Sequence, residues 1–450
     1  MPLELCMNKE VKPLKVAIKT FGCQMNEYDS QVAMGLLGHQ GFQMVEEESR
    51  ADVVLMNTCS VREHAEERVW GRLGMLGKIK KERPDLIVGL MGCMVEEHRE
   101  KLFKRFPQLD LMVGTRNIKE LPALIEEVAK NRERVARIKQ DGISIEYTDL
   151  IKRTSRFHAW LPIMTGCDKV CTFCIVPITR GAEISMSARE VYREAGRLAS
   201  EGVKWITLLG QNVNSYNGAG SSESRVSFPG LLEMLCQIGG LERISFTTSH
   251  PSDATEELFQ VIARNPKISR RFHLPLQSGS DRILKRMKRL HTYADYKEKI
   301  ERLRELVPDI SITTDIIVGF SDEGEEDYEA TRRALGEICY DGAYLYKYSV
   351  RPATPAAKLP DDVPLPVKEK RNHELLALQK KISFEKNQSW LGRRVDVFVE
   401  DQSARRAEEL LGRTLQEKKV VFPGPRDLIG TFQKISLVDV QNETFIGRVV

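Results

Sequence analysis

The sequence lacks the features that would mark a secreted, membrane-spanning or repeat protein. Its first residues contain no long apolar core of the kind that a signal peptide needs, and no later apolar run approaches the roughly 20 residues that span a bilayer. It contains no internal repeat, low-complexity tract or coiled-coil heptad pattern. The formal net charge of +4 over 450 residues is small, so it excludes neither acidic nor nucleic-acid partners. We expect a cytoplasmic protein without a membrane segment.

The nine cysteines do not indicate a disulfide framework. An odd number of cysteines in a large chain that is expected in the cytoplasm favours metal ligation or catalysis. The chain is also longer than one hydrophobic core usually organises, so we expect two or three domains.

The first predicted domain spans residues 14–130. Short apolar or β-branched runs begin at Val16, Val53, Leu86 and Leu109, and helix-like stretches separate them. This alternation is typical of a parallel, Rossmann-like α/β sheet. A polar stretch after the last of these helices is interpreted as a linker.

Two further domains follow in the pattern. Residues 153–383 contain six predicted strands, each with a plausible helix after it, which indicates a partial (β/α)6 barrel similar to a TIM barrel. Residues 386–450 contain short strands interrupted by Gly and Pro, which predict a small antiparallel β-barrel. The fold class is therefore α/β with a terminal β-barrel.

Three cysteines share one segment, TGCDKVCTFCIVPITRG, directly after the first strand of the predicted larger barrel. They are Cys167, Cys171 and Cys174. Cubane iron–sulfur clusters usually take four thiolates, so three would leave one iron open for an exchangeable ligand. Structural zinc is the alternative, but zinc ligands typically come in paired short-spaced sets, and no second CxxC or HxxxH motif follows nearby. We interpret the triplet as the ligands of a [4Fe-4S] cluster.

The spacing CxxxCxxC, with the aromatic Phe173 before the last cysteine, resembles the radical SAM superfamily. The resemblance implies that S-adenosylmethionine (SAM) chelates the open iron. It further implies that one electron from the cluster cleaves SAM into methionine and a 5′-deoxyadenosyl radical. In this reading Cys167, Cys171 and Cys174 are the catalytic residues, and Phe173 lies near the adenine of SAM.

Three more cysteines each follow a predicted strand of the first domain: Cys23 after VAIKT, Cys59 after VVLM and Cys93 after LIVGLM. Ligand sites of open α/β sheets form outside the carboxyl ends of the strands, so these side chains can converge. Gly precedes two of them, in FGC and MGC, and allows close approach of the backbone to a bulky cluster. The alternative, three buried cysteines that act as small hydrophobic residues, does not explain the shared placement.

The sequence around these cysteines is similar to the methylthiotransferases, which are radical SAM enzymes with a second [4Fe-4S] cluster on an amino-terminal domain. The resemblance covers nearly the whole chain. The motifs GCQMNEYDS, NTCSVREHAEE and GTRNIKELP resemble most closely the tRNA-2-methylthio-N6-dimethylallyladenosine synthases. This implies methylthiolation at C2 of the prenylated adenosine beside the anticodon, with one SAM as methyl donor and another as radical source. Sulfur would be methylated at the cluster of Cys23, Cys59 and Cys93.

Two alternatives remain open at this point. Relatives that modify an aspartate of a small-subunit ribosomal protein, or threonylcarbamoyladenosine in other tRNAs, carry different residues around the first cysteine. A non-enzymatic RNA-binding iron–sulfur protein or redox sensor would need the cysteines and the terminal barrel but no SAM.

The resemblance also implies contacts to SAM from polar residues at the strand ends of the larger barrel. Their strand-end placement agrees with this role, although each can instead cap a helix or close a turn. One departure from the family pattern follows Gly319 and Phe320, where Ser321 and Asp322 stand in place of the usual Pro-Gly. The implied SAM contacts are Gln211, Asn212, Ser249, His250, Gln277 and Asp315.

The partners follow from the same resemblance. The terminal barrel resembles the TRAM domain, an OB-like RNA-binding module, but its charge is nearly balanced, so RNA binding there rests on the resemblance. We expect the anticodon stem-loop of tRNA, an electron donor such as flavodoxin or ferredoxin, and a supplier of sulfur or clusters to bind a monomeric enzyme. Five basic residues on one helix can meet RNA phosphates or form a solvated face: Arg282, Lys285, Arg286, Lys288 and Arg289.

The remaining three cysteines, Cys6, Cys236 and Cys339, have no partner nearby in the sequence. We interpret them as structural or incidental.

Overall fold

A computed structural model describes residues 12–60, 63–138, 145, 147, 149–220, 224–406 and 408–450, with the backbone alone for residues 63–65. The chain forms two compact units, one of Met1–Thr154 with Ile178–Arg180 and one of Ser155–Pro177 with Gly181–Val450. Cys6 lies outside the described residues. None of the helices in the described part of the chain is both long enough and apolar enough to cross a membrane.

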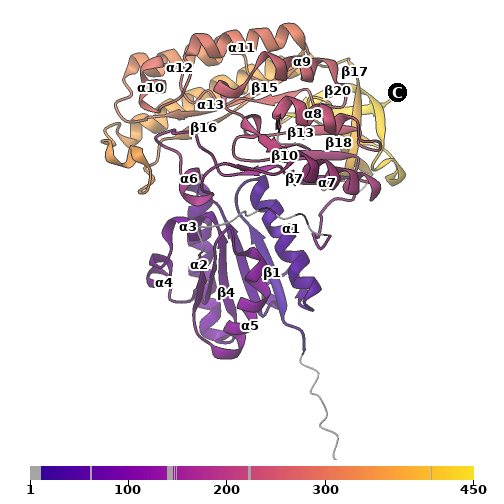
Figure 1. Cartoon of the computed structure of the whole chain (residues 1–450). Helices are drawn as coiled ribbons and strands as arrows, with labels where there is room; N and C mark the ends of the chain where they lie inside the picture. The colour runs from indigo at the N-terminus through magenta and orange to yellow at the C-terminus, as the bar shows by residue number, and fades with distance from the viewer. Residues whose placement is uncertain are drawn as a thin grey trace, which may run out of the picture. The chain divides into compact units, whose positions relative to one another are not determined.

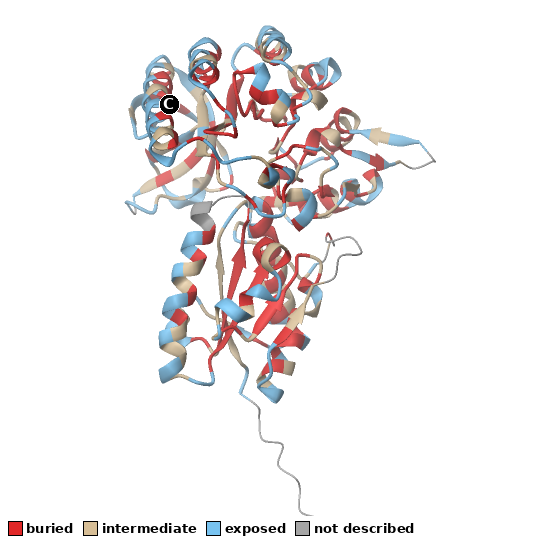
Figure 2. Cartoon of the chain, turned by 90° about the vertical axis from the view of Figure 1, so that its left-hand side faces the viewer, coloured by how far each residue is buried: buried red, intermediate tan, exposed pale blue. Residues whose placement is uncertain are grey.

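The first unit is built on a six-stranded parallel sheet in the order β2-β1-β3-β4-β5-β6. Strands β3 and β4 are buried at every position, which explains why they are continuous apolar runs in the sequence (Figure 2). The strands are β1 (Lys15–Thr20), β2 (Gln43–Met44), β3 (Val53–Thr58), β4 (Ile87–Gly92), β5 (Leu111–Val113) and β6 (Val135–Arg137).

Helices cover both faces of this sheet (Figure 1). One apolar core joins the sheet to α1 and α5, and a second core on the other face joins it to α2, α3 and α4. The Rossmann-like expectation is therefore confirmed. The helices are α1 (Gln24–His39), α2 (Glu63–Glu82), α3 (Cys93–His98), α4 (Lys101–Arg105) and α5 (Leu121–Asn131).

Two strands of this sheet were not predicted. Strand β2 has two residues and β6 has three, which is too short for either to show a periodic pattern. Strand β6 lies in the stretch that was interpreted as a linker, and it pairs in parallel with β5 at the edge of the sheet. That part of the stretch belongs to the sheet instead.

The second unit contains the six predicted strands of the larger barrel. They form two parallel three-stranded sheets, β7-β10-β13 and β14-β15-β16, and a parallel bridge between Ile244 and Ile268 joins them. The partial (β/α)6 barrel is thus confirmed. The strands are β7 (His158–Pro162), β10 (Trp205–Leu209), β13 (Arg243–Phe246), β14 (Arg271–His273), β15 (Ser311–Val318) and β16 (Gly342–Lys347).

Helices follow these strands around the outside of the barrel (Figure 1). Several begin at a Ser or Thr whose side chain accepts a hydrogen bond from a backbone amide three residues further on, as at Ser187, Thr255 and Thr292. The main helices are α7 (Ala188–Ser200), α8 (Phe228–Cys236), α9 (Glu256–Arg264), α10 (Asp281–Arg286), α11 (Tyr293–Leu306), α12 (Glu325–Ile338) and α13 (Leu365–Gln388).

The carboxy-terminal strands close into a barrel in the order β17-β18-β19-β21-β20. A closed barrel was expected, but the pairing is not wholly antiparallel, because β19 and β21 pair in parallel. Strand β18 was missed, since its polar, Gly-containing sequence ELLGRT buries only alternate residues. The strands are β17 (Arg394–Gln402), β18 (Glu409–Thr414), β19 (Lys419–Pro423), β20 (Phe432–Gln441) and β21 (Thr444–Val449).

The turn between β18 and β19 holds the small barrel against the amino ends of the larger barrel's strands. Glu417 accepts hydrogen bonds from Arg271, at the start of β14, and from the hydroxyl of Ser269, both at 2.9 Å. The backbone amide of Arg270 donates to the carbonyl of Leu415 at 2.8 Å. The small barrel thus covers the end of the strands opposite to their carboxyl ends.

Candidate functional site

The three amino-terminal cysteines follow three neighbouring strands. Cys23 comes after β1, Cys59 after β3 and Cys93 after β4, and these strands are adjacent and parallel in the sheet. Cys59 and Cys93 are buried, at 2% and 5% exposure, and Cys23 is half-buried. A Cβ at Gly22, where φ is +141°, would lie 2.6 Å from the Cβ of Cys59, so this approach requires glycine.

A pair of buried asparagines fixes the turns that carry these cysteines. The side-chain amide of Asn26 donates to Oδ1 of Asn57 and to the carbonyl of Thr58, both at 2.9 Å. The side-chain amide of Asn57 donates back to the carbonyl of Asn26 at 2.8 Å. Oδ1 of Asn26 accepts a hydrogen bond from the Cys23 thiol at 3.2 Å, and Thr58 donates to the carbonyl of Met91 at 2.7 Å. The ends of all three strands are therefore tied together.

A buried ion pair adjoins Cys93. Arg180 and Asp29 are 2.7 Å apart, with side chains 4% and 5% exposed. Burial alone would lower the pKa of Arg180, but Asp29 and the thiols of Cys93 and Cys23 raise it well above its ordinary value. Burial raises the pKa of Cys93, and the guanidinium opposes this effect. A fixed positive charge beside the thiol favours thiolate, the form that binds iron.

The second set of cysteines lies in one loop between β8 (Met164–Thr165) and α6 (Val176–Thr179). Burial raises the pKa of Cys167 to about 11 and that of Cys174 to about 12, so both thiols are protonated near neutral pH until a metal displaces the proton. The amide of Cys174 donates to the carbonyl of Cys171 at 3.1 Å, which curls the loop tightly.

The entry to this loop depends on Gly166. Its φ is +78°, and a Cβ there would collide with the carbonyl of Ala182. The side-chain oxygen of Gln211, one of the predicted SAM contacts, accepts a hydrogen bond from the Gly166 amide at 2.6 Å. Gln211 therefore positions the cysteine loop.

Two side chains contact the sulfur of Cys171. Nη1 of Arg289 donates to Sγ at 3.3 Å, and Nε2 of His250 lies 4.0 Å from it. Arg289 is only 8% exposed and is anchored by the carbonyl of Pro275 at 2.8 Å. The five basic residues do not share one helix as predicted, because α10 ends at Arg286 and Lys288 and Arg289 follow it. Arg289 therefore belongs to the cysteine site and not to an RNA-facing helix surface. Nothing in the sequence around it signals this contact.

Three of the predicted SAM contacts present buried polar atoms that have no hydrogen-bond partner among the described residues. They are Oδ1 of Asn212, Oγ of Ser249 and Oε1 of Gln277, located just after β10, β13 and β14. Buried polar atoms are normally paired, so such a group at the carboxyl ends of the strands fits a polar ligand such as SAM. The donor set and its surroundings thus fit the implied cofactor.

The other predicted contacts are engaged within the protein. Asp315 on β15 accepts a hydrogen bond from His273 at 3.3 Å. Nδ1 of His250 lies 2.8 Å from the hydroxyl of Ser252, and the ring occupies the cap of a short 3-10 helix. The half-buried ring of Phe173 packs on an apolar cluster that includes Met287.

The loop that departs from the family pattern is held by the basic helix α10. Asp322 adopts a left-handed φ of +64°, and its carboxylate pairs with Arg282 at 2.6 Å. Arg286 donates to the hydroxyl of Ser321 at 3.1 Å. Together with Arg289, three of the five basic residues that were considered for RNA binding therefore have intramolecular roles.

The isolated cysteines remain apart from both sites. Cys236 is buried in α8, and Cys339 is exposed at the end of α12. Both are free thiols.

Comparisons with known proteins agree with this architecture. Family profiles match residues 15–114 (Uncharacterized protein family UPF0004), 161–335 (Radical SAM superfamily) and 388–450 (TRAM domain). The fold also resembles TsrM from Kitasatospora setae, a radical S-adenosylmethionine methyltransferase, with a TM-score of 0.54 and 14% identity over 76% of this chain and 77% of that chain. Fold and cysteine loop thus define a radical SAM enzyme.

Two curated relatives narrow this class. The proteins of Dictyoglomus thermophilum and Carboxydothermus hydrogenoformans, both named tRNA-2-methylthio-N(6)-dimethylallyladenosine synthase, are 43% and 42% identical to this chain. The alignments cover 97% and 94% of this chain, and 98% and 96% of those proteins. The chain belongs to the tRNA-2-methylthio-N(6)-dimethylallyladenosine synthase family.

Proposed function

We propose that this protein transfers a methylthio group to C2 of N6-dimethylallyladenosine next to the anticodon in tRNA, using two SAM molecules and two [4Fe-4S] clusters. The observation that carries the proposal is the presence of two separate sets of three cysteines in a chain of this family. Each set falls one thiolate short of the usual four, which leaves one position for a reacting ligand.

Cys167, Cys171 and Cys174 would hold the first cluster. With SAM bound, this cluster supplies reductive cleavage to a radical that can activate an aromatic C–H bond, which acid–base catalysis leaves inert. The protein's part is positioning: Gln211 fixes the entry of the cysteine loop through Gly166, and Arg289 places positive charge on the sulfur of Cys171.

The carboxyl ends of the barrel strands would orient SAM. Asn212, Ser249 and Gln277 offer two side-chain carbonyl oxygens and one hydroxyl for its polar groups. Asn212 is itself fixed, because its amide donates to Asp253 at 2.7 Å, and Asp253 in turn accepts from Lys169 at 2.7 Å. This chain of bonds connects the SAM-facing residue to the cysteine loop.

Cys23, Cys59 and Cys93 would hold the second cluster, which would supply the sulfur of the methylthio group. The asparagine pair keeps the three turns in register, and Arg180 supplies a fixed positive charge beside Cys93. Buried cations next to ligand sulfurs stabilise an anionic cluster.

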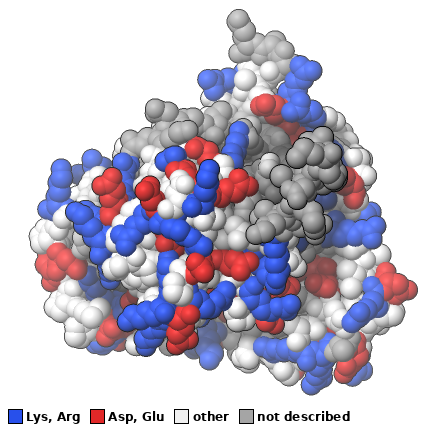
Figure 3. Space-filling view, turned by 90° about the horizontal axis from the view of Figure 1, so that it is seen from below, with Lys and Arg blue, Asp and Glu red and all other residues white. Residues whose placement is uncertain are grey.

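The proposal assigns residues 14–130 to the second cluster, 153–383 to the radical SAM core and 386–450 to tRNA binding. The charge of residues 386–450 is nearly balanced, so we assign RNA recognition there to shape and exposed loop bases as well as charge. Charged side chains of both signs are likewise intermixed on the face shown in Figure 3. The enzyme would act as a cytoplasmic monomer with a flavodoxin or ferredoxin as electron donor and a separate supplier of sulfur or clusters.

Anaerobic reconstitution followed by turnover tests the proposal. We expect about eight irons per chain from two cubanes, release of 5′-deoxyadenosine from SAM, and methylthio-modified nucleoside in digests of prenylated tRNA. Four irons, or modification of ribosomal peptides or threonylcarbamoyladenosine in place of the prenylated adenosine, would contradict it. Absence of 5′-deoxyadenosine with intact clusters would favour an iron–sulfur sensor.

A further inference from the structure

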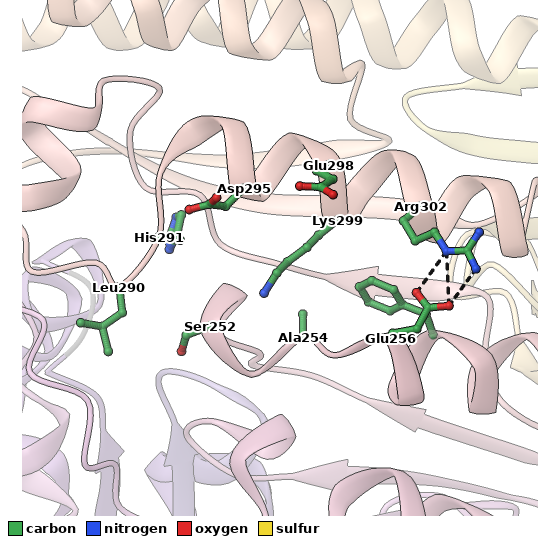
Figure 4. Close-up of a pocket in the computed structure, with 10 residues that line it drawn as sticks. Ser252, Ala254, Glu256, Leu290, His291, Asp295, Glu298, Lys299 and Arg302 are labelled. Carbon is green, nitrogen blue, oxygen red and sulfur yellow. Dashed lines mark hydrogen bonds and ion pairs between the residues drawn. The ribbon is translucent and has the colours of Figure 1, made fainter.

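A pocket of about 400 Å³ lies between α9 and α11 on the second unit (Figure 4). Ser252 and Ala254 line one side, Leu290 and His291 line one end, and Lys299 reaches across from α11. No part of the proposed reaction uses this pocket.

The pocket lies directly behind a proposed cluster ligand. Ser252 contacts His250 at 2.8 Å, and His250 lies 4.0 Å from the sulfur of Cys171. Leu290 follows Arg289, whose guanidinium donates to the same sulfur at 3.3 Å. On both paths, only one side chain separates the pocket-lining residue from Cys171.

Two large apolar side chains are exposed around this position. Val170, which precedes Cys171, is 56% exposed, and Leu290 is 57% exposed. Their segments lie side by side, because the amide of Thr172 donates to the carbonyl of Met287 at 3.0 Å. Exposed apolar groups next to a functional site indicate an interaction surface.

Cationic side chains flank the apolar pair. Lys285 and Lys288 are exposed, and neither forms an ion pair with any side chain that the structure describes. Of the carboxylates that line the pocket, Glu256 pairs with Arg302 at 2.8 Å, and Asp295 caps α11. Glu298 is exposed and forms no ion pair among the described residues, but the two unpaired lysines outnumber it. The net charge of these unpaired groups is therefore positive.

We propose that this surface, defined by Val170, Lys285, Lys288, Leu290 and the adjoining pocket, is where the electron donor docks. The donor is a small one-electron redox protein with an acidic face around its cofactor. The inference rests on the proposed function, in which one electron leaves the reduced donor and is consumed in breaking a sulfonium C–S bond of SAM. The donor is left oxidised by one electron.

The chemistry of the surface suits such a partner. Redox encounters use small, transient interfaces, and an apolar centre with a charged rim allows both contact and rapid release. Opposite charge on the partner steers its approach and raises the association rate, an effect that salt weakens. The donor would use this face because an electron that enters there has only a short distance to travel to the cluster ligand Cys171.

The test compares two reductants on the reconstituted enzyme carrying Lys285→Glu, Lys288→Glu and Leu290→Glu together. With reduced flavodoxin, we expect the initial rate of 5′-deoxyadenosine formation to fall about tenfold or more, because steering and contact are lost. With dithionite, which needs no docking surface, we expect the rate of the unmodified enzyme. Added salt should slow the flavodoxin reaction of the unmodified enzyme much more than that of the variant.

A matched control changes Lys380 and Lys381, which are exposed on α13, to Glu. We expect no change with either reductant. An equal loss with both reductants in the triple variant would overturn the docking proposal, since the change would then be structural. A raised KM for tRNA with an unchanged flavodoxin rate would also overturn it and assign the lysines to RNA. Absence of 5′-deoxyadenosine from the unmodified enzyme with dithionite would instead reject the proposed function itself.

Discussion

The two cysteine sites of this protein are built in opposite ways. Cys23, Cys59 and Cys93 come from the ends of three strands and meet only because those strands are neighbours in one parallel sheet. Cys167, Cys171 and Cys174 lie within eight residues of one loop, so the local chain conformation alone brings them together. The first site depends on the register of a whole domain, and the second depends on the shape of one turn.

The residues that support the cysteines form a connected network at the first site and separate contacts at the second. At the amino-terminal site the support is a buried network of side-chain amides and hydroxyls that connects three turns. At the loop the support consists of two separate hydrogen bonds. The Gly166 amide donates to the side chain of Gln211, and Arg289 donates to the sulfur of Cys171. Each site also has one buried arginine near a thiol, but Arg180 is paired with a carboxylate, whereas Arg289 is anchored by a backbone carbonyl. Changes at either site should therefore disable one cluster and spare the other.

The largest expected effect is that of Gly166→Ala. The new Cβ would collide with the Ala182 carbonyl in a left-handed conformation, so the loop cannot keep its shape. We expect iron content to fall from about eight to about four per chain, with complete loss of 5′-deoxyadenosine formation. Gly196→Ala in α7, where nothing surrounds the glycine, is the control and should retain both. Normal iron content in Gly166→Ala would contradict the local character of this site.

Asn57→Leu should produce the converse result. It removes one of the two acceptors of the buried Asn26 amide and the donor to the Asn26 carbonyl, at a cost of about 1–3 kcal/mol of unfolding free energy. We expect loss of the amino-terminal cluster alone, so that about four irons and 5′-deoxyadenosine formation remain while methylthiolation disappears. Iron analysis and denaturant unfolding measure the two effects. If 5′-deoxyadenosine formation were lost as well, the two sites would not be independent.

A smaller effect is expected for Arg289→Met. Removal of a positive charge from the sulfur of Cys171 should favour the oxidised cluster and lower its midpoint potential, on the order of 50 mV. An anaerobic redox titration followed by electron paramagnetic resonance measures the potential. Lys285→Met removes the same charge from the same segment but away from the sulfur, and it should leave the midpoint potential unchanged. A potential unchanged by Arg289→Met would show that the guanidinium does not act on the cluster.

The smallest effect concerns the junction of the two barrels, which is remote from both cysteine sets in the sequence. Burial alone would raise the pKa of Glu417, but Arg271 and a hydrogen bond from Ser245 bring it below its ordinary value of 4.5. A lowered folded pKa stabilises the protein above pH 4.5, and this contribution is lost as the pH falls through the folded value.

We expect the stability of the unmodified protein to fall as the pH drops below 4.5, and we expect Glu417→Gln to lack this part of the pH dependence, as measured by urea unfolding. Iron content at pH 7 should not change. An identical pH dependence in the two proteins would contradict the assigned charge state of Glu417.

The sequence was sufficient to predict features that repeat or alternate. The strands before Cys59 and Cys93 were predicted because they are buried at every position and are therefore continuous apolar runs. The strand before Cys23 and the six strands of the larger barrel were predicted because short apolar or β-branched runs alternate with helix-like stretches. Strands β2, β6 and β18 were missed because they are too short or too polar to show a period. The linker interpretation failed at β6 for the same reason.

The partners of charged side chains could not be predicted. Arg289 stands in a run of basic residues, and only the folded chain turns it inward onto Cys171. Arg180 likewise follows the cysteine loop in sequence, but it belongs to the first unit, where it pairs with Asp29. The assignment of cluster and SAM ligands remains a prediction, supported by the convergence of the cysteines and by the unpaired atoms of Asn212, Ser249 and Gln277 among the described residues.

The most direct test of a two-site enzyme is the reaction of the triple variant Cys23→Ala, Cys59→Ala and Cys93→Ala with SAM, dithionite and prenylated tRNA. Mass spectrometry would measure 5′-deoxyadenosine and the methylthio nucleoside in the same sample. We expect that 5′-deoxyadenosine still forms and that no methylthio nucleoside appears. Formation of the methylthio nucleoside by this variant would contradict the assignment of the second cluster to these cysteines.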